Sequence, residues 1–155
     1  MIGTALLVGS MFIAGWSKQP TEERPLVRLL VGGGFQTEPQ EVLATIFSDG
    51  RYKTAAGELH GPAASLVPLR TRLRRLQKVT QASLDAEIAR SGVRDPGMRN
   101  ATPRYGIELR LPSGQIRMVQ IWSPKTYRCR SLSQVDIFLS VLDAVAAFSA
   151  VKVDA

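Results

Sequence analysis

The segment FSDGRYKT, residues 47–54, decides how this chain folds. Asp49-Gly50 stands between an apolar run, residues 42–47, and a short segment at residues 51–54. This dipeptide favours a two-residue hairpin turn, because both turn positions of that geometry require a positive φ. The segment therefore predicts two antiparallel strands, residues 42–47 and 51–54, joined at Asp49-Gly50.

Further strands are predicted on both sides of this hairpin. Residues 26–31, LVRLLV, form a β-rich run before it. Residues 105–111 alternate apolar with other side chains, which indicates a half-buried strand. Pro112 to Gln115 predicts a turn with Gly114 at its permissive position, and residues 116–122 return as a strand. Because residues 116–122 are apolar on both faces, we expect that strand to lie in the middle of the sheet.

Two helices are predicted between the hairpins. Residues 62–79 carry leucines at three- and four-residue spacing, which gives one apolar helical face. Those leucines are Leu66, Leu69, Leu73 and Leu76. Pro68 is expected in the first turn, where its missing N–H costs little. Thr80 is expected to cap a second helix that runs to about residue 87 and ends before Gly92, with Leu84 and Ile88 facing inward.

A last helix is predicted from Ser133, where Ser133 and Asp136 approximate a capping box. Its buried stripe consists of Val135, Phe138, Leu142 and Val145. The order is thus strand, hairpin, helices, hairpin, helix. Hairpins imply antiparallel pairing, so the sequence predicts an α+β fold in which helices pack on one face of an antiparallel sheet.

The first residues have a different character. Residues 1–16, MIGTALLVGSMFIAGW, contain no charged side chain. As a helix they would span about 24 Å, which is short for a bilayer core of about 30 Å but suits the apolar region of a signal peptide. Residues 17–25, SKQPTEERP, are then a polar tether, and residues 26–155 form a single domain. The alternative is that residues 1–16 are a buried part of that domain.

The chain resembles uncharacterised bacterial exported lipoprotein-type domains over about residues 26–150. The resemblance rests on the element order, on Gly33-Gly34-Phe35 after the first strand, and on Asp49-Gly50-Arg51. Ile13-Ala14-Gly15 also resembles the residues before the lipidated cysteine of lipoprotein signals. Trp16 stands where that cysteine would be, so lipidation is not expected. The resemblance implies export, to the periplasm or cell envelope, and carries no functional residues.

The charge distribution points to anionic partners. The chain has 20 Lys and Arg against 13 Asp and Glu, a net charge of +7 and a pI near 10.2. Such a balance favours nucleic acid, acidic lipid or a polyanionic wall polymer. No acid occurs between Glu58 and Asp85, or between Glu108 and Asp136. The candidate anion-binding residues in these two intervals are Arg70, Arg72, Arg74, Arg75, Lys78, Arg128 and Arg130. The alternative is that they form a solvated face.

No catalytic or metal-binding pattern stands out in the sequence. His60 and Cys129 are the only histidine and the only cysteine, too few for the usual zinc ligands, and any chain with one of each contains such a pair. Gly32-Gly33-Gly34 follows a strand, but Pro39 and the absence of a Lys-Ser or Lys-Thr ending argue against a phosphate loop. The sequence therefore predicts no cofactor, no metal and no enzymatic activity.

Two functional hypotheses follow. The first is an exported or membrane-tethered, non-enzymatic envelope domain whose basic face contacts anionic lipid, wall polymer or a protein partner. The alternative is a cytoplasmic nucleic-acid-binding protein that uses the same face. Aromatic residues make up only 6% of the chain and no nucleic-acid-binding motif is present, which favours the first hypothesis. The oligomeric state is left open.

Overall fold

A computed structural model describes residues 24–33, 40–93 and 102–153, and the proposed signal segment, most of the tether and the Gly34-Phe35 motif lie outside them. One six-stranded antiparallel sheet has the order β4-β3-β2-β1-β5-β6. Its strands are β1 Pro25–Gly32, β2 Glu41–Phe47, β3 Arg51–Thr54, β4 Gly57–His60, β5 Arg104–Arg110 and β6 Ile116–Trp122. The helices are α1 Ala63–Leu76, α2 Gln81–Arg90, the 3-10 helix η2 Pro124–Tyr127 and α3 Ser133–Ser149.

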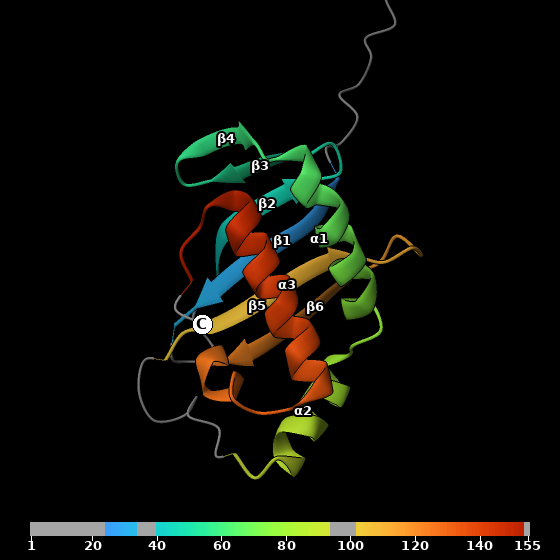
Figure 1. Cartoon of the computed structure of the whole chain (residues 1–155), viewed down its shortest axis with the longest axis vertical. Helices are drawn as coiled ribbons and strands as arrows, with labels where there is room; N and C mark the ends of the chain where they lie inside the picture. The colour runs from blue at the N-terminus through green and yellow to red at the C-terminus, as the bar shows by residue number, and fades with distance from the viewer. Residues whose placement is uncertain (1–23, 34–39, 94–101, 154–155) are drawn as a thin grey trace, which may run out of the picture.

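The helices α1 and α3 cross one face of the sheet, and α2 lies beside its β6 end (Figure 1). This arrangement confirms the predicted α+β class and the antiparallel pairing. The core lies between the sheet and this helix layer. The stripe predicted for α3 is buried throughout, and three of the four leucines predicted for α1 are buried, with Leu66 half-buried. Full burial of such a side chain stabilises the fold by about 1.5–3 kcal/mol.

The two predicted hairpins are present, but their turn geometry differs from the two-residue form expected at Asp49-Gly50. Strand β2 ends at Phe47 and β3 begins at Arg51, with Ile46 paired to Tyr52, which leaves a three-residue loop, residues 48–50. The Gly50 N–H donates to the Phe47 carbonyl at 3.1 Å, and only Gly50 in this loop has a positive φ, of 91°. The loop is therefore a type I turn followed by a left-handed glycine. Gly114, with φ 86°, closes the β5–β6 hairpin in the same way.

Strand β6 was expected in the middle of the sheet, and that prediction is wrong, because β6 is an edge strand. Its apolar outer side chains stay accessible, with Ile116 58% and Met118 40% exposed. At Gln120 this edge meets Gln81 of α2 instead of another strand. The Gln120 N–H donates to the Gln81 side-chain oxygen at 2.9 Å, and the Gln81 amide donates to the Gln120 carbonyl at 3.1 Å. At this one residue a side-chain amide makes the two hydrogen bonds that a neighbouring strand would make.

Strand β4 at the opposite edge was not predicted. The structure continues the sheet through a second tight turn at Ala55-Ala56 into β4, which ends at His60. This segment shows no alternation of apolar and polar side chains from which a strand could be inferred. It has a glycine at each end, and Leu59 is its only apolar side chain.

Pro68 and the start of α3 also differ from expectation. Helix α1 begins at Ala63, so Pro68 is inside the helix rather than in its first turn. Thr80 caps α2 as predicted, in a reciprocal capping box with Ser83. In α3, however, Ser133 makes no capping bond, because the helix begins at Ser133 itself after Leu132.

The Glu87 carboxylate of α2 caps α3 in place of the predicted box. It accepts hydrogen bonds from the Gln134 N–H at 2.7 Å, the Val135 N–H at 3.0 Å and the Ser133 hydroxyl at 3.0 Å. These are donors that a helix N-terminus leaves without intrahelical partners, and the negative charge suits that end of the helix. The cap therefore ties α2 to α3.

Candidate anion-binding surface

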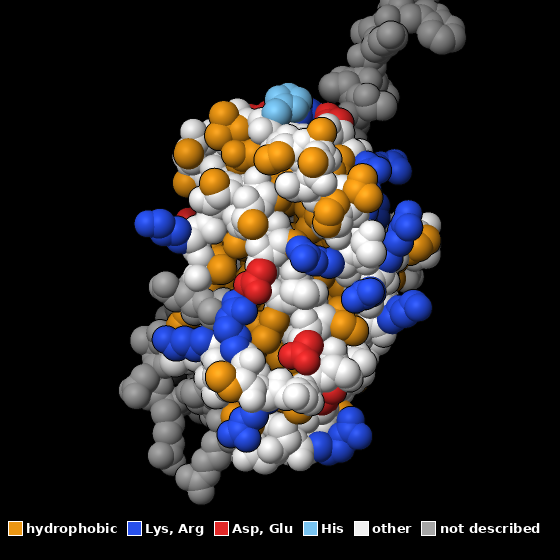
Figure 2. Space-filling view, viewed as in Figure 1, with side chains coloured by type: hydrophobic (Ala, Val, Ile, Leu, Met, Phe, Trp, Pro, Cys, Tyr) orange, Lys and Arg blue, Asp and Glu red, His pale blue; other side chains and the backbone are white. Residues whose placement is uncertain are grey.

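Five cationic side chains line the outward face of α1 and the residues just after it. Leu69, Leu73 and Leu76 bury one side of the helix, so the intervening cations are left on the other side. All five are exposed. We call this set the α1 basic surface: Arg70, Arg72, Arg74, Arg75 and Lys78. Figure 2 shows Lys and Arg side chains gathered along the side of the molecule where α1 lies in Figure 1.

No residue of the α1 basic surface forms an ion pair with an acidic side chain of the described segments. Arg70 donates to the Ser48 carbonyl at 2.6 Å, which fixes it beside the β2–β3 turn. Arg74 and Arg75 lie in the last turn of α1, where cations interact favourably with the helix dipole by about 0.3–1 kcal/mol each. The helix dipole is therefore a partial structural reason for the cations at Arg74 and Arg75. It gives no such reason for Arg70, Arg72 and Lys78.

The cations of β1 and β3 behave differently. Arg51 donates to the Asp49 carboxylate at 2.7 Å and to the Glu58 carboxylate at 2.8 Å, and Lys53 also contacts Glu58. The hydrogen bonds from Arg51 lower the pKa of Asp49 and, together with those from Lys53, lower the pKa of Glu58 below their ordinary values. Arg28 pairs with Glu108 at 3.1 Å. These charges are locally neutralised, which sets the α1 basic surface apart from them.

The structure does not join Arg128 and Arg130 to the α1 basic surface. Both follow η2, and α3 lies between that segment and α1 in Figure 1. Arg128 forms a two-pronged ion pair with Asp143 of α3, at 2.6 and 3.0 Å, and this contact raises the pKa of Arg128. The seven candidate residues are therefore two separate groups, and the Arg128 charge is already matched.

Sequence reasoning missed one cation that lies beside α1. Arg117 of β6 donates to the Gln77 carbonyl at 2.7 Å and to the Val79 carbonyl at 3.4 Å. It therefore sits at the C-terminal end of α1, close to Lys78 in the chain. The interval without acids between Glu108 and Asp136 included Arg117, but only the sheet order could show that β6 borders α1.

Aromatic side chains are scarce on the described surface. Every described phenylalanine and tyrosine is buried, and Trp122 is half-buried under the Arg104 guanidinium, 5.0 Å from its ring. Single-stranded nucleic acid is normally held by bases stacked on exposed aromatic rings. The described part of the chain offers no such platform.

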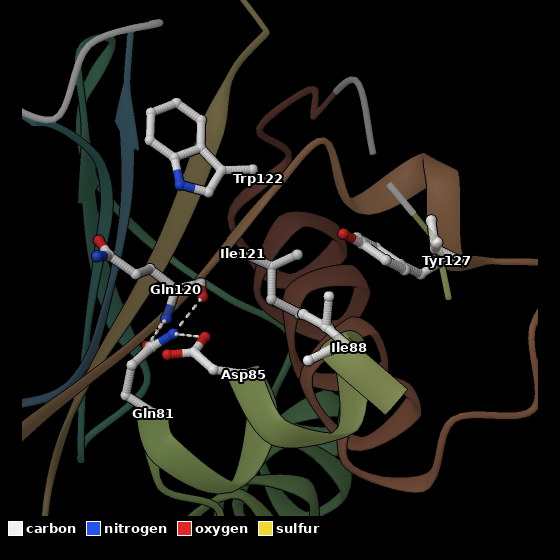
Figure 3. A pocket seen from close by; sticks show the side chains of 9 residues that line it. Gln81, Asp85, Ile88, Gln120, Ile121, Trp122 and Tyr127 are labelled. Atoms are coloured by element: carbon white, nitrogen blue, oxygen red, sulfur yellow. Dashed lines mark hydrogen bonds between the residues drawn. The ribbon is translucent and has the colours of Figure 1, made fainter. Parts of the chain in front are cut away.

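A cavity of about 410 Å³ lies between α2 and β6. Figure 3 shows the Gln81 amide at its rim, engaged with Gln120 and with the Asp85 carboxylate at 2.8 Å. Ile88, Ile121 and Tyr127 supply much of the remaining wall. Asp85 is the only carboxylate among the lining residues. Its hydrogen-bond partner, the Gln81 amide, is also bonded to Gln120 at the edge of the sheet. The described residues that line this cavity include no acid–base or nucleophile–base pair.

The one histidine and the one cysteine are far apart in the structure. His60 ends β4 at one edge of the sheet, and Cys129 follows η2 beyond the opposite edge strand, exposed to solvent. Five strand spacings of about 4.8 Å separate those two edges. Among the described residues no three His, Cys, Asp or Glu side chains gather as metal ligands, and no described helix has the length and apolarity needed to cross a bilayer.

Comparison with known proteins adds no further constraint. No family model, no curated protein and no solved structure matches this chain.

Proposed function

We propose that this protein is a membrane-tethered or exported, non-enzymatic domain that lies against an anionic membrane surface through the α1 basic surface. The carrying observation is the contrast between the cations of α1, which lack acidic partners among the described residues, and those of β1 and β3, Arg28, Arg51 and Lys53, which are paired. Uncompensated cations at four-residue spacing repel one another by a few tenths of a kcal/mol per pair. An anionic surface removes that repulsion and adds attraction.

Anionic lipid is favoured over nucleic acid by the side chains around the cations. Val67, on the same helix, is 68% exposed, and an apolar side chain among cations suits the interface between headgroups and acyl chains. Nucleic acid offers no comparable apolar layer, and the described surface lacks exposed aromatic rings for base stacking. We therefore retain nucleic acid as the alternative that the experiment must separate.

The route of the chain into the domain supports the same orientation. Pro25 at the start of β1 pairs with Phe47, and the carbonyl of the next residue, Ser48, accepts the hydrogen bond from Arg70. The polypeptide therefore reaches the domain beside the α1 basic surface. If residues 1–16 engage a membrane, a tether of a few residues brings that surface toward the same membrane.

Vesicle binding by the full chain tests the proposal. Arg72→Gln, Arg74→Gln and Lys78→Gln together remove three charges while keeping long helix-forming side chains, and they avoid placing acids at the helix C-terminus. At about 1 kcal/mol per basic residue near the surface, the variant should bind anionic vesicles about a hundredfold more weakly. Binding to zwitterionic vesicles, which reports on the apolar N-terminal run, should not change. Raising the salt concentration should erase the difference.

A matched variant controls for net charge. Arg90, Lys125 and Lys152 are exposed and lie on α2, on η2 and after α3. Changing these three to Gln lowers the formal charge from +7 to +4, as the first variant does (7 − 3 = 4). This control should keep anionic binding near the parent level. If both variants lose vesicle binding equally, the loss reflects net charge and not the α1 basic surface. If the parent retards nucleic acid in a mobility-shift assay but does not bind vesicles, the nucleic-acid alternative is the right one.

A further inference from the structure

Strand β4 is an edge strand of the sheet that the described residues form. Among the described strands it pairs only with β3, and all four of its residues are exposed. Figure 1 shows β4 at one end of the molecule, with no labelled element beyond it. At the other edge, β6, the outward groups of Gln120 are bonded to Gln81. The two edge strands of the sheet therefore differ in their partners.

The hydrogen-bond ladder fixes which β4 groups point outward. The Gly61 N–H donates to the Gly50 carbonyl at 3.0 Å, and antiparallel pairs alternate between bonded and non-bonded positions. Counting from Gly50–Gly61 along the β3–β4 register, Leu59 bonds to β3, whereas the N–H and C=O groups of Glu58 and His60 point away from it. The edge thus offers two donors and two acceptors at alternate residues.

Apolar side chains surround this edge. Leu59 is 52% and Val67 is 68% exposed, and several small apolar residues of the β3–β4 turn and the start of α1 are exposed beside them. Figure 2 shows hydrophobic side chains gathered at the end of the molecule that holds β3, β4 and the beginning of α1. The exposed apolar set is Ala55, Ala56, Leu59, Pro62, Ala63, Ala64 and Val67.

We propose that β4 pairs antiparallel with β4 of a second copy of this chain, about a two-fold axis at Leu59. In that register Glu58 lies opposite the second copy's His60, and His60 lies opposite the second copy's Glu58. The outward groups of both residues then form four backbone hydrogen bonds. Leu59 meets its counterpart at a non-bonded position, where the Cα atoms of paired residues come within about 4.5 Å. Two six-stranded sheets become one.

The side chains of β4 select this partner and this register. Moving the register by two residues keeps backbone bonding but places Glu58 against Glu58, or His60 against His60, and like groups directly opposite are unfavourable. The central register alone matches carboxylate with imidazole twice and leucine with leucine once. A two-fold interface requires such self-complementarity. On the neighbouring strand β3, Arg51 and Lys53 contact Glu58, so the charged side chains extend from β4 onto β3.

Sedimentation of the full chain tests the pairing through two opposite substitutions. In density-matched non-ionic detergent, the parent should shift from one chain mass, 16.9 kDa, to twice that mass as its concentration rises. Leu59→Glu and Leu59→Lys each place like charges across the two-fold axis, so each should remain at one chain mass. An equimolar mixture of the two places Glu against Lys and should return to the double mass.

The outcomes separate this proposal from other modes of association. Ile116→Glu introduces the same charge at an apolar residue of similar exposure on β6 and should dimerise as the parent does. A parent that stays at one chain mass, single variants that still associate, or a mixture that fails to recover the double mass would each overturn the proposal. Leu59 is exposed, so circular dichroism should show parent-like folding in both variants.

Discussion

Replacing Glu87 by alanine tests the most unusual contact in the helix layer. The carboxylate is half-buried and receives two backbone N–H groups of α3 and one hydroxyl. Helix-capping side chains contribute about 0.5–2 kcal/mol, and hydrogen bonds to a charged group contribute about 1.5–3 kcal/mol. In the variant, water can solvate part of the N-terminal end of α3. The capping and hydrogen-bond contributions to stability therefore do not simply add. We expect Glu87→Ala to lower the free energy of unfolding by about 2 kcal/mol.

Chemical and thermal unfolding measure this loss. For a chain of this size about 2 kcal/mol corresponds to a fall in melting temperature of roughly 4–8 °C. Glu87→Gln keeps one acceptor oxygen but no charge, so its melting temperature should lie between those of the parent and Glu87→Ala. The Val135 amide should exchange its hydrogen faster in both variants. If Glu87→Ala melts within a degree of the parent, the carboxylate does not cap α3 and the reasoning fails.

Three further substitutions have defined outcomes. Gly61→Ala should lower the free energy of unfolding by about 1–3 kcal/mol, because an added Cβ overlaps the Phe148 ring; thermal melting measures it, and an unchanged melting temperature would show that the ring moves aside freely. Arg51→Gln should raise the pKa of Glu58 toward 4.5, its ordinary value, in a carboxyl NMR titration. Because the folded pKa is the lowered one, Glu58 stabilises the fold above pH 4.5 and loses that effect as pH falls through its folded pKa. Cys129→Ser should leave the melting temperature unchanged within experimental error, since the thiol is exposed.

Local patterns in the sequence predicted the elements of this fold well. The glycines at positions 50 and 114 mark the two hairpins because each provides a left-handed residue after a tight turn. Three of the four predicted leucines of α1, and the apolar stripe of α3, follow the helical period and are buried as expected. The exposure of the α1 cations follows from the same period, since they occupy the positions between the leucines.

Relations between distant segments were not predictable in the same way. Apolar residues on both faces of residues 116–122 suggested a central strand, but Gln81, 39 residues before Gln120, satisfies that edge instead. The cap of α3 likewise comes from Glu87 rather than from the adjacent Ser133. Arg128 was grouped with the α1 cations, although it pairs with Asp143. In each case a polar side chain found its partner through the packing of the elements, which periodicity does not encode.

The Gln81 amide has a consequence that polymer chemistry describes well. A subunit with two reactive edges is a bifunctional monomer, and it grows into open chains of indefinite length. Gln81 occupies the outward groups of Gln120 on β6 with both its oxygen and its nitrogen, so a strand added at that edge would have to displace it. In the pairing proposed above, β4 is the edge that reacts, and growth stops at two copies. The Gln81 amide then acts as a chain terminator at the opposite edge.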